Sequence, residues 1–397
     1  MSQSSRQFFT VVKPRMKTDK LISFLIPARS EFPNIIHTVY SIIHAMEADG
    51  FTDKDFEIIL GDNCSNDSKF PQKATGGTSD FFIHRGMYAK NVLRVFYDPI
   101  AGNHKTTNHL ARLARGKYIF RSDAHMAYKP GFFARWLQTV EESKGLVHTG
   151  IHWMGTYPSE LRTLGIAYTL KFGEEFKGTW NGYHLTGGKD WFYIPMQGHA
   201  GYGILRDQFL KIRGYHPQIR AYGGGEIYLD MKCWMLGIPV VAEPRCVSYH
   251  LSAGRGYSYH HDDYIHNVLL VGLALGADMW VERAKINWLR RGRREVVEHL
   301  WDLAYQESRE DRRWFERWRK KKGPVMSFDD LMITRPWEKL NDEKHGQHIE
   351  SLLVYQPTFE RLLEEGSYAK ELYDSSPLQK KMKEFVYEHL NKFIYKS

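Results

Sequence analysis

The chain has 397 residues, of which 42% are hydrophobic, so it can form two domains or one large domain with an appendage. Its formal net charge of +9 fits a polyanionic partner, and it fits an enzyme that binds an anionic cofactor equally well. The 3 cysteines lie far apart, which argues against a disulfide framework and indicates a reducing compartment. Residues 1–19 lack the apolar core of a signal peptide, and the longest apolar run, residues 268–277, is too short to cross a bilayer. We therefore expect a soluble, cytoplasmic protein without a membrane partner.

Strand and helix patterns alternate through the first part of the chain. Apolar runs and helical spacing predict strands at residues 21–27, 56–60, 92–97 and 117–120, and helices at residues 34–46 and 103–114. This alternation predicts an α/β fold with an open, mostly parallel sheet. Ligands of such sheets bind beyond the carboxyl ends of the strands, where Pro27, Asp62 and Asp123 lie.

The predicted secondary structure changes twice in the rest of the chain. Short strands are predicted at residues 147–153 and 240–242, on either side of a region rich in glycine and aromatic residues. Amphipathic helical patterns dominate beyond about residue 270. We therefore expect an N-terminal extension at residues 1–19, a catalytic domain at residues 20–262 and a basic, mainly helical region at residues 263–397.

Asp123-Ala124-His125 follows the strand predicted at residues 117–120 and is the most informative motif. Residues i and i+2 of a strand point to the same side, so the carboxylate of Asp123 and the imidazole of His125 can meet one ion. A carboxylate with an imidazole suits Mn²⁺ better than Mg²⁺, which prefers oxygen and water ligands. Taken alone, the motif fits an aspartate at a strand end beside a surface histidine equally well.

Further segments in the same order and spacing resemble glycosyltransferases of the GT-A fold, family 2 type. They lie at residues 26–31, 61–67, 102–119, 198–215, 222–226 and 236–241. The Asp-x-His motif, and the Gly-Gly-Glu at residues 224–226 with the later Tyr249-His250, resemble polypeptide N-acetylgalactosaminyltransferases most. The resemblance covers about residues 20 to 255 and implies a Rossmann-like GT-A catalytic domain that uses a UDP-sugar.

The resemblance also implies a donor site and a metal site. The residues matched to the nucleotide, diphosphate and sugar are Pro27, Ala28, Arg29, Glu31, Asp62, Lys105, Asn108, Ser122, Asp123 and Gly201, with Asp62 bonded to the uracil ring. Asp123, His125 and His250 would bind Mn²⁺, or Mg²⁺ in its place. For His250 the alternative is a histidine at a strand end with an ordinary structural role. The weaker competitors for the third ligand are His260, His261 and His266.

Glu226 is the candidate catalytic base, because a sugar hydroxyl is a poor nucleophile and an inverting enzyme needs a group that takes its proton. Counted forward from the glycines, Glu226 matches the glutamate of Gly-Gly-Glu and contacts the acceptor or stabilises the fold. Counted backward from Gly237, it matches the base. Asp230, one helical turn further on, is the second candidate for the base. If Glu226 is not the base, a retaining reaction is open.

Four other residues are expected to face the acceptor, although packing is an alternative role for each aromatic ring. They are Trp153, Trp191, His199 and Tyr202.

Residues 283–322 hold fourteen lysines and arginines against seven acidic residues, with four tryptophans between them. Basic and aromatic side chains in this pattern can bind phosphates and stack on bases. An amphipathic helical cap, with its tryptophans packed and its charges in water, explains the same pattern.

Three hypotheses for the function follow. The favoured acceptor is a 5-hydroxymethylpyrimidine in DNA, which would make nucleic acid a partner and the chain similar to the phage and base J glycosyltransferases. The second is a protein Ser/Thr or a saccharide acceptor. The third is a non-catalytic protein that binds a nucleotide sugar or a nucleic acid. The sequence leaves the donor sugar open between a hexose and a pentose, and it leaves the oligomeric state open.

Overall fold

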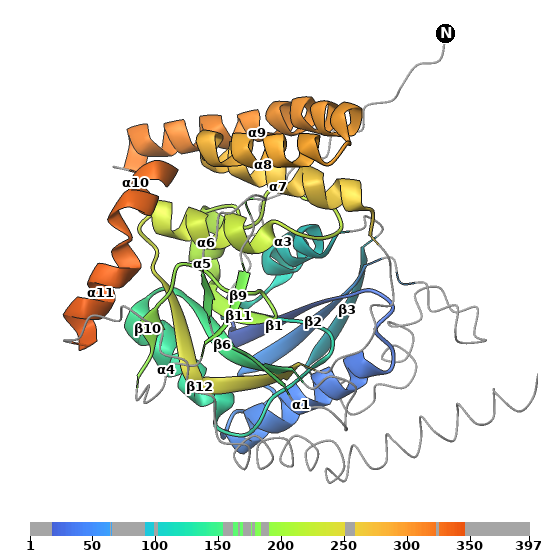
Figure 1. Cartoon of the computed structure of the whole chain (residues 1–397). Helices are drawn as coiled ribbons and strands as arrows, with labels where there is room; N and C mark the ends of the chain where they lie inside the picture. The colour runs from blue at the N-terminus through green and yellow to red at the C-terminus, as the bar shows by residue number, and fades with distance from the viewer. Residues whose placement is uncertain are drawn as a thin grey trace, which may run out of the picture.

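A ten-stranded sheet forms the centre of the described part of the molecule (Figure 1). The computed structural model describes residues 18–63, 65, 92–98, 102–153, 162–165, 167–169, 176, 179–183, 190–250, 259–322 and 325–345. The long strands are β1 (Lys20–Ala28), β2 (Phe56–Asn63), β3 (Leu93–Asp98), β4 (Gly116–Ser122), β6 (Leu146–Trp153), β11 (Gly201–Leu205) and β12 (Val240–His250). The short ones are β5 (Met126–Ala127), β7 (Arg162–Gly165) and β10 (Phe192–Tyr193). A separate small sheet pairs β8 (Ala167–Thr169) with β9 (Thr179–Tyr183).

The strand order is β10-β12-β6-β11-β4-β1-β2-β3, with β5 beside β12 and β7 beside β6. β1 is parallel to β2 and β4, β2 is parallel to β3, and β12 is parallel to β6. β11 runs antiparallel to both β4 and β6 and joins the two parallel halves. The predicted open, mostly parallel α/β sheet is therefore confirmed, and the strands and helices predicted before residue 122 are all present.

β12 is longer than predicted, and its length matters for the site. The sequence predicted residues 240–242, whereas the strand continues to His250. Its register against β6 shifts between Glu243 and Val247, which is a β-bulge that absorbs Pro244 and its neighbours. After the bulge the pairing resumes, and His250 lies opposite Trp153 of β6 and Met126 of β5.

Helices cover both faces of the sheet because alternate strand residues point to opposite faces. On β1, Ile22, Phe24 and Ile26 pack with α1 (Asn34–Ala48) and α4 (Phe132–Ser143) in one buried cluster. Leu25 points the other way, into a cluster that includes side chains of α3 (Asn103–Leu113), α5 (Arg206–Lys211) and α6 (Gly225–Met235). The result is a three-layer α/β/α arrangement with a core on each side of the sheet.

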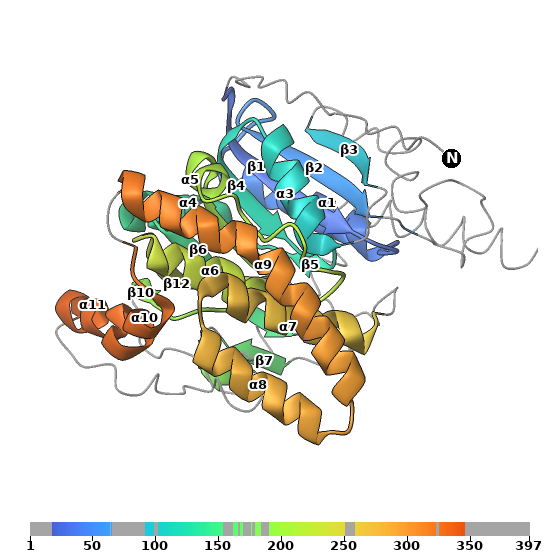
Figure 2. The same cartoon turned by 90° about the horizontal axis from the view of Figure 1, so that it is seen from above.

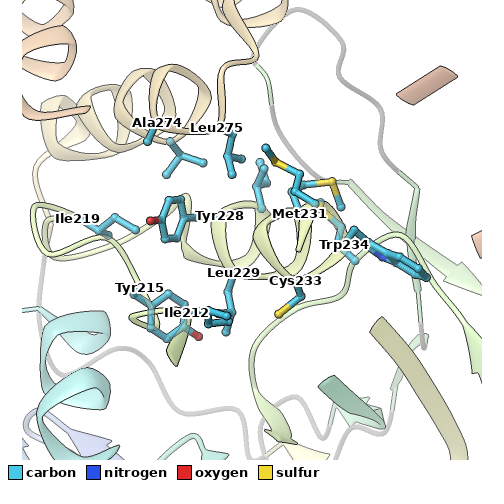
Figure 3. Packing of buried hydrophobic residues seen from close by; sticks show 14 of the residues in the cluster. Ile212, Tyr215, Ile219, Tyr228, Leu229, Met231, Cys233, Trp234, Ala274 and Leu275 are labelled. Atoms are coloured by element: carbon cyan, nitrogen blue, oxygen red, sulfur yellow. The ribbon is translucent and has the colours of Figure 1, made fainter. Parts of the chain in front are cut away.

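Three of the C-terminal helices, α7 (His261–Leu275), α8 (Asp278–Arg290) and α9 (Arg294–Lys322), add a further layer above α6 (Figure 1). The last two, α10 (Phe328–Thr334) and α11 (Pro336–His345), lie at the side of the molecule, where α11 contacts β10 at the edge of the sheet. Figure 3 shows Ala274 and Leu275 of α7 packed near Tyr228 and Met231 of α6. Figure 2 shows α9 lying along α7. The expected division at residue 262 therefore marks a change in sequence pattern, while one hydrophobic cluster continues across it.

The tryptophans of the basic region are parts of this packing. Trp288 and Trp314 are buried in the cluster that α6 shares with the C-terminal helices. Lys285 lies 4.2 Å from the ring centre of Trp301, and Lys211 lies 5.3 Å from that of Trp318. In the described residues no helix combines the length and the hydropathy of a membrane span.

Candidate metal and donor site

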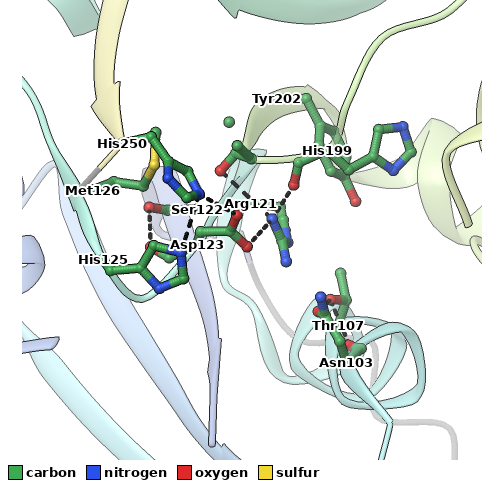
Figure 4. A network of polar contacts seen from close by, with 12 residues as sticks. Asn103, Thr107, Arg121, Ser122, Asp123, His125, Met126, His199, Tyr202 and His250 are labelled. Carbon is green, nitrogen blue, oxygen red and sulfur yellow. Dashed lines mark hydrogen bonds and ion pairs between the residues drawn. The ribbon is translucent and has the colours of Figure 1, made fainter. Parts of the chain in front are cut away.

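The three predicted metal ligands converge at the carboxyl end of the sheet (Figure 4). Asp123 directly follows β4, His125 directly precedes β5, and His250 ends β12. The Nε2 atoms of His125 and His250 are 3.0 Å apart, and His250 Nε2 lies 3.5 Å from Asp123 Oδ2. The pairing of β5 with the end of β12 is therefore what brings His250 to the Asp-x-His motif.

Glu31 lines the pocket, as predicted, and it also contacts one of the metal ligands. Its Oε2 atom lies 3.0 Å from His125 Nδ1. Burial opposes a charge on this imidazole, but the Glu31 carboxylate outweighs burial and raises the pKa of His125. A hydrogen bond from Nδ1–H to Glu31 leaves Nε2 of His125 directed at His250 and Asp123. This is the outer carboxylate arrangement that orients histidine ligands in metal sites.

The donor set fits a divalent first-row metal. One carboxylate oxygen and two imidazole nitrogens lie within 4.8 Å of one another. Burial and the neighbouring His125 lower the pKa of His250, which favours the neutral form that can bind a metal. Without a metal ion, the 3.0 Å between the two Nε2 atoms requires a proton between the rings, and a bound cation would take the place of that proton.

Arg121 forms an ion pair with Asp123 on the side away from the histidines. Arg121 was not identified from the sequence as a residue of the site. Its side chain is buried, and its Nη1 atom lies 2.6 Å from Asp123 Oδ1. Burial alone would raise the pKa of Asp123, but the Arg121 guanidinium outweighs it and holds that pKa well below the usual range. Oδ2 of the same carboxylate is left for the histidine side of the site. The sequence feature that could have identified Arg121 is its positive charge next to the apolar residues Ile119 and Phe120 of a buried strand.

A pocket lies beside these ligands, where β1 and β2 end. Its lining residues are Pro27, Ala28, Arg29, Glu31, Asn63, Gly102, Asn103, Asp123, Ala124, His125 and Ala221. The sequence had assigned the first four to the nucleotide, and it missed Asn63, Gly102 and Asn103. Asn63 Oδ1 accepts a hydrogen bond from Gly102 N at 2.8 Å, and this bond joins the end of β2 to the start of α3.

Four predicted donor-binding residues already have partners within the protein. Asp62 is fully buried and its Oδ1 accepts from Ser65 N at 3.0 Å. Asn108 is bonded to both the backbone N and O atoms of Tyr215. The Ser122 hydroxyl lies 2.6 Å from Tyr128 OH, and Gly201 is packed against the side chain of Thr149. The hydrogen bonds of Asp62, Asn108 and Ser122 and the close packing of Gly201 stabilise the walls of the site. Lys105 is half-buried beside Gly102, in the first turn of α3, and is not among the described lining residues.

The structure also corrects the predicted roles of Asp230, His199 and Tyr202. Asp230 is fully buried, and its oxygens lie within hydrogen-bond distance of His148, His199 and Gln197 N. His199 Nδ1 lies 2.6 Å from Tyr215 OH, and Tyr202 OH lies 2.5 Å from the same hydroxyl. The polar atoms of all three side chains are therefore directed at partners inside the protein, which disfavours Asp230 as the base and His199 and Tyr202 as acceptor contacts.

Trp191 lies at the wrong end of β12 to contact an acceptor. The next residue, Phe192, pairs with Ala242, which is eight residues, or roughly 26 Å, from His250 along the strand. Trp191 is buried and donates from Nε1 to Glu142 at 2.9 Å. Trp153 does belong to the region of the site, since its backbone pairs with His250. Its side chain lies outside the described part of the structure.

The other histidine candidates do not join the ligand cluster. His266 is buried in α7, where its Nε2 lies 2.8 Å from Glu307 Oε2. His260 is the N-cap residue of α7, and His261 packs against Trp288.

Glu226 lies half-buried in the first turn of α6, beside a tightly packed backbone. Gly224 has φ +78°, which favours glycine. A Cβ on Gly225 would lie 1.9 Å from His104 Nε2, so a larger residue there would displace the histidine. These glycines fix the start of α6. They leave the role of Glu226 as base a prediction.

The comparisons with known proteins all give similarity to glycosyltransferases. Residues 23–192 match the model of the family described as Glycosyl transferase family 2. The protein named "Putative polypeptide N-acetylgalactosaminyltransferase 13" from Drosophila melanogaster is 25% identical over 265 residues, which cover 57% of this chain and 44% of the fly protein. A crystal structure of GalNAc-T7 with UDP, GalNAc and Mn²⁺ is 18% identical and superposes with a TM-score of 0.51, over 64% of this chain and 47% of that chain. This chain spans less than half the length of these relatives. Residues 23–192 thus match glycosyl transferase family 2, on a fold of the GT-A type that this chain shares with GalNAc-T7.

Proposed function

We propose that this chain is a metal-dependent glycosyltransferase that moves a sugar from a UDP-sugar to an acceptor hydroxyl. The convergence of Asp123, His125 and His250 beside the pocket at the ends of β1 and β2 is the observation that carries this proposal. A diphosphate in that pocket needs a cation to offset its charge, and the three donor atoms suit Mn²⁺. The family match and the ligands of the GalNAc-T7 structure support the same function.

A bound metal ion would act as a Lewis acid that stabilises the departing UDP. The chain itself supplies the positions of the ligands. Arg121 keeps Asp123 ionised and fixes one of its oxygens, and Glu31 orients His125. The carboxyl ends of β1 and β2, with Asn63 and Gly102, form the wall on which the nucleotide would lie.

Glu226 would take the proton from the acceptor hydroxyl as that oxygen attacks the anomeric carbon, with inversion. Its place in the first turn of α6, near the pocket residue Ala221 in sequence, supports this role. If Glu226 only contacts the acceptor, a retaining reaction is open.

We infer that the acceptor is a protein Ser/Thr hydroxyl or a saccharide. The name of the fly relative supports a polypeptide acceptor. The DNA acceptor favoured from the sequence has no such support. The tryptophans expected to stack on bases instead pack against the hydrophobic core or against basic side chains of this chain. Arg213 and Lys232 lie 5.6 and 4.8 Å from the ring centre of the buried Trp314, and Arg291 lies 4.8 Å from that of Trp288. The assembled metal site makes a purely binding function the weakest of the three hypotheses.

The acceptor is tested by measuring UDP release from a panel of UDP-sugars with Mn²⁺. The acceptors are a Ser/Thr-rich peptide, an oligosaccharide and DNA that contains 5-hydroxymethylcytosine. We expect turnover with the peptide or the oligosaccharide. Turnover only with the modified DNA, falling steeply as salt rises, would overturn this choice of acceptor.

Glu31 should matter for metal binding without contacting the metal. Glu31→Leu removes the carboxylate that orients His125, and we expect Mn²⁺ affinity to fall about tenfold. Glu31→Gln keeps an acceptor oxygen and should recover part of that loss. A titration followed by the electron paramagnetic resonance of free Mn²⁺ measures all three proteins. Equal affinities would show that Glu31 does not orient this ligand.

A further inference from the structure

A buried network of polar side chains joins α6 to the back of the metal site. We propose that Asp230 is a positioning residue that, through His199, holds the residue 197–200 segment whose carbonyl oxygens seat Arg121 and so fix Asp123 for metal binding. This inference rests on the proposed metal-dependent function. It gives a role to His148, His199 and Asp230, a second buried cluster of groups that can hold a metal and that shares no residue with the donor pocket or with Asp123, His125 and His250. Their hydrogen bonds to one another and to Tyr215 and Gln197 assign this cluster to the structural network described below.

Asp230 is the acceptor at the centre of the network. Its Oδ1 lies 2.9 Å from His199 Nε2 and 3.2 Å from His148 Nε2, and its Oδ2 accepts from Gln197 N at 2.9 Å. The Asp230 side chain is completely buried. Burial alone would raise its pKa, but the two histidines outweigh burial and lower the pKa of Asp230 to about 2. A carboxylate is thus maintained in the interior by donors on both of its oxygens.

The direction of each hydrogen bond follows from this carboxylate. Because a carboxylate only accepts, His199 donates from Nε2, and in a neutral imidazole Nδ1 is then an acceptor. Tyr215 OH, at 2.6 Å, donates to that nitrogen and accepts in turn from Tyr202 OH at 2.5 Å. With His199 neutral, this arrangement of protons satisfies the chain from Tyr202 to Asp230, and the bonds at both of its nitrogens hold the ring of His199 in one orientation.

The backbone of the same segment reaches the metal site. Ala200 O accepts from Asp123 N at 2.8 Å. Arg121 donates from Nη1 to the carbonyl oxygen of His199 and contacts Ala200 O at 3.5 Å (Figure 4). Gln197 anchors the start of the segment by donating from Nε2 to Thr149 O at 2.5 Å. The position of Arg121, and with it that of Asp123, is therefore set by a segment that Asp230 holds at two points.

The isosteric change Asp230→Asn tests this role. An asparagine presents an N–H group to one of the donors that now bond Asp230, so the network loses bonds while its volume stays the same. We expect the dissociation constant for Mn²⁺ to rise by up to about tenfold, because a carboxylate bonded directly to a metal ligand is worth about tenfold or more and Asp230 acts through a backbone segment and Arg121. The affinity for UDP in the presence of EDTA should change little, since the pocket wall on β1 and β2 is untouched.

Glu57→Gln is the matched control. Glu57 is an equally buried carboxylate that accepts from Ser23, Arg94 and Arg115, and it lies six residues, or roughly 20 Å, from Asn63 along β2. Both variants should unfold at lower temperature, and only Asp230→Asn should lose Mn²⁺ affinity. A wild-type chain that binds Mn²⁺, with an Asp230→Asn variant of unchanged affinity, would overturn this inference alone. A wild-type chain that binds no Mn²⁺ would overturn the proposed function and this inference with it.

Tyr215→Phe covers the case in which Asp230→Asn does not fold. The change removes the hydroxyl that bonds His199 and Tyr202 and keeps the ring that packs against His104 and Phe209. We expect a smaller loss of Mn²⁺ affinity, about threefold, with a folded protein by circular dichroism. A folded Tyr215→Phe variant with wild-type Mn²⁺ affinity would contradict the coupling through His199.

Discussion

Asp123→Asn is expected to lower Mn²⁺-dependent turnover of the UDP-sugar by about two to three orders of magnitude. The change removes a negative ligand, and a metal that stabilises the leaving group contributes several kcal/mol to the transition state, at about 1.4 kcal/mol for each factor of ten. It also removes the charge that Arg121 faces at 2.6 Å. UDP release under saturating Mn²⁺ measures the effect, together with the Mn²⁺ dissociation constant.

Two further variants separate catalysis from folding. Asp207→Asn changes an exposed aspartate that also lies beside an arginine, Arg206, and should keep full turnover. His250→Ala removes a ligand without touching the Arg121 ion pair, and it should lose turnover while remaining folded. Full activity in either His250→Ala or Asp123→Asn would contradict the assignment of these residues to the metal.

Glu226→Gln should reduce turnover by about two orders of magnitude if Glu226 is the base, since general-base catalysis contributes a factor of about 10²–10⁴. The amide keeps the size of the side chain and cannot take a proton from the acceptor. We expect kcat to fall while the KM for the acceptor changes little. Nuclear magnetic resonance of the product should show an inverted anomeric centre.

Glu295→Gln is the control for this change, because Glu295 also occupies the first turn of a helix and is exposed on α9, among the C-terminal helices. It should behave as the wild type. A Glu226→Gln variant with normal kcat and a raised KM for the acceptor would show a contact role. A retained anomeric configuration would exclude Glu226 as the base of an inverting reaction.

The sequence predicted the sheet and two of the metal ligands from local pattern alone. Apolar runs that end in Pro27, Asp62 and Asp123 indicated parallel strands, and the i, i+2 spacing of Asp123 and His125 indicated a shared ion. His250 came from the resemblance to a family. Strand propensity did not predict it, because Pro244 interrupts the pattern at the bulge in β12.

The residues assigned to catalysis or acceptor binding by chemical type were predicted less well. Asp230, His199 and Tyr202 carry groups that are common in active sites, but each has hydrogen-bond partners inside the protein. Burial depends on contacts between β4, β11 and α6, which are far apart in the sequence, so the sequence does not reveal it. The same limit applies to Trp191, whose ring contacts Lys344 of α11 at 3.6 Å from the ring centre.

The most direct test of the central claim is calorimetric titration of UDP into the wild-type chain and the Asp123→Asn variant, each with Mn²⁺ and with EDTA. If the pocket beside Asp123, His125 and His250 holds a metal–diphosphate complex, UDP should bind the wild type at least about tenfold more tightly with Mn²⁺, which corresponds to about 1.4 kcal/mol. The variant should show no such difference. Equal UDP affinity of the wild type with Mn²⁺ and with EDTA would contradict the account.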